Sequence, residues 1–417
     1  MPRIRGSNIV VDDFRFAARN RLCKNLVYFL SHFHADHYRG LSEAFDGGPI
    51  YCTAATKVMV EQRFPRLRVA VETRAYNEEF EVALNAAEGI TARVTFLDAN
   101  HILGSAMLLF RGDFGTVLYT GDMRFHDALP RRWTGLCGPD GALAVAVDEL
   151  ILDNTYCDPI FRFPSQERCV EIVKDIIERA RREGEVDVHI HCYTVGKEEI
   201  CLELARHFRT KVVLEPERHR LVRRIGYHPD CFTAVEGEGW IHMRSGGGRP
   251  AAAAAQRLDI HLSGWINCPS YLSLQPNEFL VAYSSHSNYA ELERFVALVR
   301  PAVLSNVVVE RRAEGREPPA ANYFFWLKNM PQKGFAELQR RYTDSARASP
   351  AYARLDDPAC LAEAYRRLGI EKPPREVDLG LFRADNRQFC DSKKRARPQG
   401  ALSYRPRGDG AAKRVKL

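Results

Sequence analysis

Residues 32–37, HFHADH, place three histidines and an aspartate together, directly after the apolar run NLVYFL at residues 25–30. An apolar, aromatic-rich run of this length predicts a buried strand. Imidazoles and carboxylates bind Zn²⁺ at about 2.0–2.2 Å, and several of them must converge on one point. Histidines at alternate positions can converge where the backbone turns at the end of a strand. We therefore interpret four residues as metal ligands: His32, His34, Asp36 and His37.

HFHADH resembles the HxHxDH signature of the metallo-β-lactamases, and the rest of that family's ligand order follows along the chain. His101, in LDANHILGSAM, stands at the place of the third histidine ligand, and Asp122, in YTGDMRF, at that of the bridging aspartate. Asp12, in VVDDF, matches the early supporting aspartate better than its neighbour Asp13 does. The resemblance implies one tightly bound zinc on His32, His34, His101 and Asp122, and a weaker second metal site on Asp36, His37 and Asp122.

Three later motifs narrow the resemblance. LILDNTYCDP (150–159) resembles the opening of the β-CASP insertion, with Asp153 as its acid, and YTVGKEE (193–199) resembles a later segment of that insertion. YSSHSNYAEL (283–292) resembles the returning motif, whose histidine is His286 here. Together, over roughly residues 8–310, the motifs resemble the DNA cross-link-repair nucleases, the branch that includes Apollo and Artemis. One departure is the loop after the third histidine, which reads His101-Ile102-Leu103-Gly104 where the family usually has HCPG, so the loop loses a proline.

The resemblance implies an α/β fold, namely a metallo-β-lactamase αββα sandwich with an inserted smaller α/β β-CASP domain. The apolar runs predict strands at 91–99, 104–110, 115–122 and 148–156. From Ser165, a capping residue ahead of a helical pattern, helix and strand alternate as in a small α/β domain. We expect the first part of the sandwich at 1–160, the insert at 161–277, the returning part at 278–330, a helical extension at 331–384 and a disordered basic tail at 385–417.

The composition is that of a large globular protein, with 417 residues of which 45% are hydrophobic. No apolar run is long enough for a membrane span, the first residues do not read as a signal peptide, and 11 scattered cysteines favour a reducing compartment. The net charge of +7 belongs to the tail, since residues 385–417 hold ten Lys/Arg and three Asp/Glu. We therefore expect no association with membranes, and a body that is close to neutral.

The resemblance implies hydrolysis of a phosphodiester. Zinc suits this reaction, because it lowers the pKa of its bound water and offsets the negative charge of the phosphate. The residues expected to take part are Asp36, His37, His286, Asp12 and Asp153, with Asp153 orienting a histidine. A 5′-terminal phosphate needs donors, and the candidates are Ser284, Ser287, Lys197 and Tyr193. Arg220, Arg223 and Arg224 lie in the predicted helix ERHRLVRRIG and are candidates for contact with the DNA backbone. His189 and His191 would share one side of a strand, without further ligands nearby in the sequence.

Two basic clusters in the tail resemble nuclear localisation signals. They are formed by Lys393, Lys394, Arg395, Lys413, Arg414 and Lys416. A tail of this composition can also bind nucleic acid without specificity. We expect a nuclear protein whose partners are DNA, single-stranded or with a free 5′-phosphate, and repair or telomere proteins that bind the tail.

The function that these features favour is a zinc-dependent 5′-to-3′ DNA exonuclease, acting in interstrand cross-link repair or at DNA ends, including telomeres. Four alternatives remain open at this point. They are a structure-specific endonuclease of the Artemis type, a β-CASP RNA-processing nuclease, a hydrolase of small thioesters or lactams, and a non-catalytic binding scaffold. The insert argues against a small-molecule hydrolase, and the complete ligand set argues against a scaffold.

Overall fold

The structure is a computed structural model, which describes residues 4–15, 25–192, 195–245, 256–264, 266, 268–307, 333–343, 354–355 and 357–370. The described residues belong to one compact unit, formed by Met1–Ser245 and Ala254–Pro373. The other unit, Gly246–Ala253 and Pro374–Leu417, lies outside the described residues, and so does the basic tail. Among the helices of the described part, none combines the length and the apolar character needed to cross a bilayer.

A four-stranded parallel sheet comes first in the chain, in the order β1-β2-β3-β4. Its strands are β1 (Ile9–Val11), β2 (Val27–Phe29), β3 (Ile50–Cys52) and β4 (Val71–Thr73). Alternate side chains face opposite sides, as in any strand. In β2, Tyr28 packs on the side of helix α2 (Ala54–Arg63), whereas Val27 and Phe29 pack on the other side.

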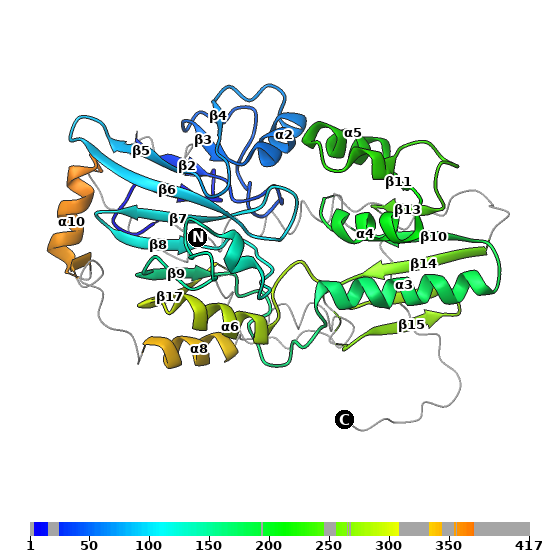
Figure 1. Cartoon of the computed structure of the whole chain (residues 1–417). Helices are drawn as coiled ribbons and strands as arrows, with labels where there is room; N and C mark the ends of the chain where they lie inside the picture. Colours follow the sequence, from blue (N-terminus) through cyan, green and yellow to red (C-terminus); the bar gives the residue numbers. More distant parts are fainter. Residues whose placement is uncertain are drawn as a thin grey trace, which may run out of the picture. The chain divides into compact units, whose positions relative to one another are not determined.

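A six-stranded sheet has the order β17-β9-β8-β7-β6-β5 (Figure 1). Its strands are β5 (Glu79–Asn85), β6 (Ile90–Asp98), β7 (Ala106–Gly112), β8 (Gly115–Tyr119), β9 (Glu149–Leu152) and β17 (Val303–Asn306). In β7, Ala106, Leu108 and Phe110 share one core with β1 and β2 of the first sheet. Met107 and Leu109 join a second core with helices α6 (Tyr289–Val299) and α8 (Lys333–Thr343).

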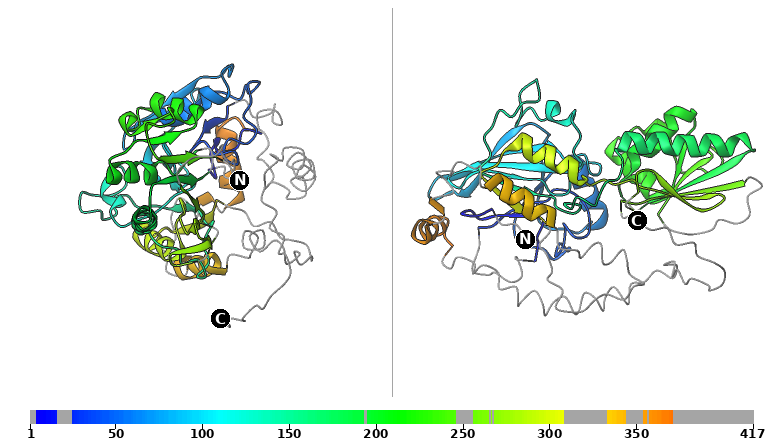
Figure 2. Two further views of the ribbon diagram at one scale, coloured as in Figure 1. Left: turned by 90° about the vertical axis from the view of Figure 1, so that its right-hand side faces the viewer. Right: turned by 90° about the horizontal axis from the view of Figure 1, so that it is seen from below.

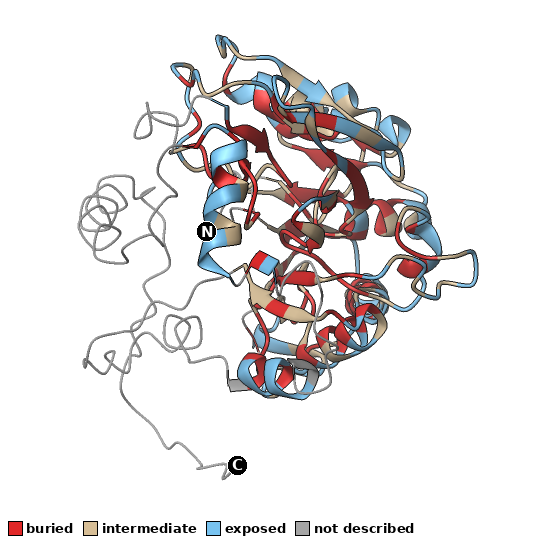
Figure 3. Ribbon diagram, turned by 90° about the vertical axis from the view of Figure 1, so that its left-hand side faces the viewer, coloured by how far each residue is buried: buried red, intermediate tan, exposed pale blue. Residues whose placement is uncertain are grey.

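These cores define four layers: helix α2, the four-stranded sheet, the six-stranded sheet, and helices α6 and α8. Figure 2 shows α6 and α8 side by side across the six-stranded sheet. The central strands of the two sheets are buried over most of their length, whereas the outward surfaces of the helices are exposed (Figure 3). Helix α10 (Pro358–Arg367) adds Tyr365 to the core between the sheets.

A seven-stranded sheet lies between β9 and β17 in the chain, in the order β12-β11-β13-β10-β14-β16-β15. Its strands are β10 (Val186–His191), β11 (Val212–Leu214), β12 (Phe232–Thr233), β13 (Ile241–Arg244), β14 (Gln256–Leu262), β15 (Tyr271–Gln275) and β16 (Glu278–Val281). One face packs on helices α3 (Gln166–Arg182), α4 (Glu198–Phe208) and α5 (Pro216–Ile225). Ser165 caps α3 by accepting a hydrogen bond from the Arg168 N–H, as its sequence predicted. Two short 3₁₀ helices complete the described elements, η1 (Leu129–Arg132) and η2 (Pro229–Cys231).

The end of this sheet differs from the predicted boundary at residue 277. β16 pairs in parallel with β14, from Asp259↔Glu278 to Leu262↔Val281, so it belongs to the seven-stranded sheet. The chain therefore returns to the six-stranded sheet only after Val281. An apolar run such as EFLVAY predicts a strand but carries no information about which sheet it joins, so the sequence alone does not place this boundary.

Candidate metal centre

The residues expected to bind metal follow the carboxyl ends of adjacent strands. β1 and β2 pair in parallel up to Val11↔Phe29, so Asp12 and the segment from Ser31 leave the same edge of the sheet. β8 and β9 also pair in parallel, and Asp122 and Asp153 follow them. His101 lies in the loop between β6 and β7. Six segments of the chain therefore meet, and the sixth is the loop after β16 that carries His286.

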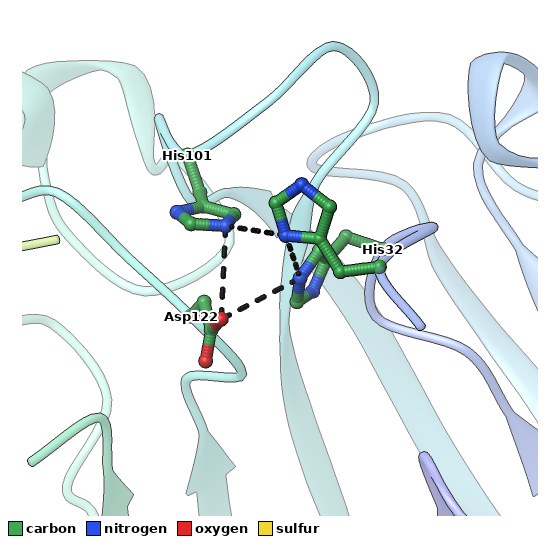
Figure 4. Close-up of side chains that lie close together, drawn as sticks. His32, His101 and Asp122 are labelled. Carbon is green, nitrogen blue, oxygen red and sulfur yellow. Dashed lines mark hydrogen bonds and ion pairs between the residues drawn. The ribbon is translucent and has the colours of Figure 1, made fainter. Parts of the chain in front are cut away.

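Four ligand atoms face one another at the centre of this cluster. The Nδ1 atom of His34 lies 3.0 Å from His32 Nε2 and 3.1 Å from His101 Nε2. Asp122 Oδ2 lies 3.6 Å from the Nε2 atoms of both His32 and His101 (Figure 4). Ligands about 2.0–2.1 Å from a tetrahedral metal are separated by about 3.4 Å. The observed spacings bracket that value, so these four atoms have the separations of a tetrahedral ligand set.

Hydrogen bonds on the far side of each ring decide which nitrogen carries the proton. His101 Nδ1 lies 2.8 Å from the carbonyl oxygen of Ser285, and His34 Nε2 lies 3.4 Å from that of Val195. A carbonyl oxygen can only accept, so both ring nitrogens donate. The Ser31 hydroxyl donates to Asp12 Oδ2 and so accepts from His32 Nδ1, 3.0 Å away. The three converging nitrogens, His32 Nε2, His34 Nδ1 and His101 Nε2, therefore carry no proton, and each presents a lone pair.

Three lone pairs and a carboxylate oxygen directed at one point repel one another unless a cation lies between them. Burial adds to the effect: His32 is 0% exposed, and burial lowers the pKa of His32 and His101 well below 6.5, so these rings stay neutral. The donors are of the imidazole and carboxylate type that suits zinc and related transition metals. The residues therefore fit a divalent transition-metal ion.

Asp12 is the hub that holds the HFHADH segment in place. Its Oδ1 accepts from the Ser31 N–H (2.8 Å), and its Oδ2 accepts from the Ser31 hydroxyl (2.6 Å), His37 Nδ1 (2.8 Å) and the Tyr119 hydroxyl (2.8 Å). Asp12 is 2% exposed and has a left-handed backbone conformation, with φ 54°. Its neighbour Asp13 instead pairs with Arg15 at 2.7 Å, so of the two aspartates Asp12 is the one in contact with the HFHADH segment.

Two further imidazoles, those of His37 and His286, also lie near Asp122. His37 Nε2 is 3.2 Å from Asp122 Oδ1, and His286 Nε2 is 3.9 Å from Asp122 Oδ2. His286 Nδ1 lies 2.8 Å from Asp153 Oδ2, so Asp153 orients this histidine. Asp122 thus stands between two sets of imidazoles. Asp36, expected to bind the second metal, is exposed and lies outside both groups.

The loop that carries His101 is held in place despite the missing proline. Ser105 Oγ accepts from the N–H groups of His101 (3.1 Å) and Ile102 (3.2 Å), and the Gly104 carbonyl accepts from the hydroxyls of Thr53 and Thr56. A Cβ at Gly104 would lie 2.6 Å from Ala55 Cβ, so the glycine allows this close approach. These hydrogen bonds restrain the loop at the place where the family usually has a proline.

Comparison with known proteins agrees with this geometry. A family profile described as "Beta-lactamase superfamily domain" matches residues 16–180, and one described as "DNA repair metallo-beta-lactamase" matches residues 229–311. The chain belongs to the DNA repair metallo-β-lactamases. The predicted family and fold, an αββα sandwich with an inserted β-CASP domain, are therefore confirmed. A divalent-metal centre follows from membership of this family together with the His/Asp cluster.

Relatives of this DNA repair metallo-β-lactamase are named for nuclease activity or repair. The chain is 33% identical over 300 residues to the rat 5′ exonuclease Apollo, which covers 72% of this chain and 52% of that protein. It is 35% identical over 314 residues to the chicken 5′ exonuclease Apollo, covering 73% and 63%. It is 29% identical over 362 residues to the Arabidopsis thaliana DNA cross-link repair protein SNM1, covering 78% and 69%. The chain thus spans about half the length of the rat relative.

The two serines expected at a 5′-phosphate are engaged within the metallo-β-lactamase fold. Ser287 is 1% exposed, and its hydroxyl donates to the Met123 carbonyl (3.1 Å) and accepts from the Phe125 N–H (2.9 Å). The Ser284 hydroxyl donates to the His286 carbonyl and accepts from the His286 N–H, both at 2.9 Å. Both hydroxyls make hydrogen bonds within the loop around His286, and their contact with a 5′-phosphate stays a prediction.

The Lys197 side chain is largely enclosed by the protein, whereas the three arginines of helix α5 are exposed. The Lys197 ammonium donates to the Leu262 carbonyl at 2.6 Å, and burial lowers its pKa to about 8. Arg220 pairs with Glu217, Arg224 pairs with Glu61 of helix α2 at 3.4 Å, and Arg223 is exposed. These three arginines are accessible for the predicted contact with DNA. Tyr193 lies outside the described residues, as do the basic clusters of the tail.

His189 and His191 acquire neighbours that are distant in the sequence. The His189 ring stacks on His242 with centroids 4.8 Å apart, and the His191 ring stacks on His261 at 4.4 Å. His191 Nε2 lies 2.6 Å from Asp259 Oδ1. The register of β10 with β13 and β14 brings these rings together, and neither ring belongs to the ligand groups among the described residues.

Five residues that sequence reasoning missed hold the centre together. Ser31 and Tyr119 bind Asp12, as described above, and Gly121 allows the close approach of Ser31, since a Cβ there would lie 2.8 Å from Ser31 Oγ. Arg124 and Glu291 form a buried pair beside the loop of His286. Each lies within or directly beside a recognised motif, but the motif gives no sign of which distant residue its side chain contacts.

Metal binding is expected to release protons at pH 7. Burial alone would lower the pKa of His286, but the carboxylates of Asp153 and Asp122 raise it to about 9, and Asp122 and Asp12 likewise raise the pKa of buried His37 well above 6.5. Both rings are therefore protonated in the metal-free protein at pH 7, and a cation beside Asp122 opposes that charge. This protonation stabilises the metal-free fold fully below about pH 6.5, and the contribution is lost as the pH rises through about 9.

Titration calorimetry with Zn²⁺ in two buffers of different ionisation enthalpy measures this release. The observed enthalpy should differ between the buffers, and the affinity should rise with pH towards about 9. Equal enthalpies in the two buffers at pH 7 would contradict the protonated state of both rings.

Proposed function

We propose that this chain is a zinc-dependent 5′-to-3′ DNA exonuclease that acts in interstrand cross-link repair or at DNA ends. The convergence of three imidazole lone pairs on Asp122 carries the proposal, because it fits a hydrolytic metal centre. The printed names of the rat and chicken relatives, 5′ exonuclease, support the polarity and the class of substrate.

Each group has a role in this proposal. His32, His34, His101 and Asp122 hold the first metal, and His37 and Asp122 contribute to a second, weaker site. A bound divalent ion supplies a Lewis acid that lowers the pKa of water towards about 7 and offsets the charge of the phosphate. Asp12 fixes the tautomer of His37 and, through Ser31, that of His32. Asp36 is exposed within the segment, and we propose that it contributes to the second site or orients the attacking water.

His286 lies where it can contact a phosphate oxygen. Its ring is 23% exposed, whereas the Asp153 carboxylate behind it is 1% exposed. The His286 Nδ1 proton is held by Asp153, so Nε2 is the atom available to substrate or to the second metal site. The candidates for contact with the 5′-phosphate among the described residues are Ser284, Ser287 and Lys197. Arg220, Arg223 and Arg224 are proposed to follow the DNA backbone.

Digestion of one 3′-labelled single-stranded DNA oligonucleotide tests the activity. One form carries a free 5′-phosphate, the other has its 5′ end blocked, and an Asp36→Ala/His37→Ala variant runs alongside. The proposal expects a ladder from the free 5′-phosphate alone, absent in the variant. Equal cutting of both forms would identify an endonuclease of the Artemis type. If neither DNA is cut, the DNA exonuclease is excluded, and the same pair made of RNA tests the β-CASP RNA-processing alternative.

We also propose that the protein acts in the nucleus. The support is the pair of basic clusters in the tail and the repair function in the names of relatives. Proteins of repair complexes or telomeres are the proposed partners of this tail. A chain ending at residue 384, expressed beside the whole chain, tests the import signal, and equal nuclear fractions would exclude it.

A further inference from the structure

Arg124 is a buried arginine whose guanidinium forms hydrogen bonds with main-chain carbonyls and with one carboxylate. It follows Asp122 by two residues, and its side chain is 2% exposed. Nη1 donates to the carbonyl oxygens of Ser284 (3.0 Å) and His286 (3.2 Å). Nη2 donates to the Pro164 carbonyl (3.0 Å) and to Glu291 Oε1 (2.9 Å). One guanidinium thus holds three main-chain carbonyls and one carboxylate.

The carbonyls belong to the two segments that join the seven-stranded sheet to the rest of the chain. Pro164 lies in the first segment, between β9 and α3, and Ser284 and His286 lie in the second, between β16 and α6. The planar guanidinium presents five N–H donors in a fixed fork, so it can hold several acceptors at set angles. Arg124 therefore fastens both connections of the insert to the loop that also carries Asp122.

The second segment contributes directly to the metal centre. The Ser285 carbonyl accepts from His101 Nδ1 at 2.8 Å and so fixes which nitrogen of that ring faces the metal. The next residue, His286, is held against Asp153. Arg124 binds the carbonyls on either side of Ser285. A displacement of this segment would move the acceptor of His101 and the ring of His286 together.

Glu291 fixes Arg124 in turn. Its Oε2 accepts from the Asn288 N–H at 2.9 Å, within the capping box of α6, while Oε1 accepts from Arg124. The Glu291 side chain is 7% exposed, so the pair is buried on both sides. A buried ion pair is costly to break from one side, because the remaining charge has no water to solvate it. The geometry therefore binds helix α6, the returning segment and the Asp122 loop into one unit.

We propose that Arg124, locked by Glu291, is a positioning residue that sets the 284–286 segment against the metal centre and so couples the placement of the insert to hydrolysis. The coupling to hydrolysis rests on the proposed nuclease function, whereas the coupling to the metal centre does not. Lysine at this position keeps the charge but offers a single ammonium, which cannot satisfy four acceptors in the guanidinium geometry.

The test compares Arg124→Lys and Glu291→Gln with a matched control, Arg294→Gln. Arg294 lies on the same helix as Glu291 and pairs with Asp127 at 3.0 Å, but its side chain is 49% exposed. Each variant is loaded with Co²⁺, and the visible absorption spectrum and the affinity are measured on folded protein. We expect Arg124→Lys and Glu291→Gln to change the spectrum and to lower metal affinity or kcat by about 10–100-fold. The KM for 5′-phosphorylated DNA should change little, and the control should match the wild type.

Three outcomes separate the proposals. Folded Arg124→Lys and Glu291→Gln proteins with the wild-type Co²⁺ spectrum, affinity and kcat would overturn the positioning role, even if the melting temperature falls. A wild-type chain that binds Co²⁺ but does not cut DNA would refute the nuclease, while the cobalt comparison would still decide the role of Arg124. A wild-type chain that binds no Co²⁺ would overturn both.

Discussion

Asp122→Asn should abolish DNA hydrolysis, with a loss in rate of at least about three orders of magnitude. Asp122 stands between the two groups of imidazoles, 3.6 Å from His32 and His101 and 3.2 Å from His37. An amide removes the negative charge that offsets the cation, and metal-assisted stabilisation of several kcal/mol is lost with it. The bound metal, measured by plasma mass spectrometry after dialysis, should fall along with the rate measured on 5′-phosphorylated DNA.

A suitable control is Asp127→Asn, because Asp127 lies in the same loop with its side chain 75% exposed. The control should keep both metal and activity. A dialysed Asp122→Asn protein with full metal content and wild-type rate would show that this carboxylate does not bind the catalytic metal.

Glu198→Ala should destabilise the protein by about 3–5 kcal/mol, because it leaves a buried guanidinium without its carboxylate. Glu198 Oε1 lies 2.9 Å from Arg218 Nη1, and both side chains are 2% exposed. Glu198 also accepts from the Gly196 N–H at 3.0 Å, so it fixes the turn that places Lys197. Denaturant unfolding, followed by a probe in the seven-stranded sheet, measures the loss.

The exposed pair one helix away provides the comparison. Glu217 and Arg220 are 3.2 Å apart with side chains 82% and 68% exposed, so Glu217→Ala should change the unfolding free energy by about 0.5 kcal/mol or less. Equal effects of the two substitutions would contradict the assignment of Glu198 as a buried structural charge.

The sequence predicted the candidate metal ligands better than it predicted the residues that hold those ligands in place. His32, His34, His101 and Asp122 could be recognised because ligand type and spacing along a loop are local properties. Tyr119 could not be recognised, since its hydroxyl reaches Asp12 only after β1 and β8 are brought together. Arg124 could not be distinguished from other charged residues in the sequence, because its four hydrogen-bond acceptors lie 40 or more positions away along the chain.

The same distinction applies to the fold. The long apolar runs at β6, β7 and β8 predicted strands, because a buried strand is apolar over its whole length. The three-residue strands β1, β3 and β4 are too short to carry a pattern. Ser284 and Ser287 illustrate the limit at the site: a hydroxyl in a loop reads as a donor for ligand, and only the packed structure shows that its bonds are already made.

The order of the strands also has a consequence during synthesis on the ribosome. β9 pairs with β17, from Val303↔Glu149 onwards, so the edge of the six-stranded sheet waits for the whole insert to emerge. His101 receives its acceptor, the Ser285 carbonyl, at the same late stage. A nascent chain folds from its N-terminus as it appears. A chain whose synthesis stops within the insert therefore carries His32, His34, His101 and Asp122 but lacks His286. The candidate metal centre is complete only after translation has passed that residue.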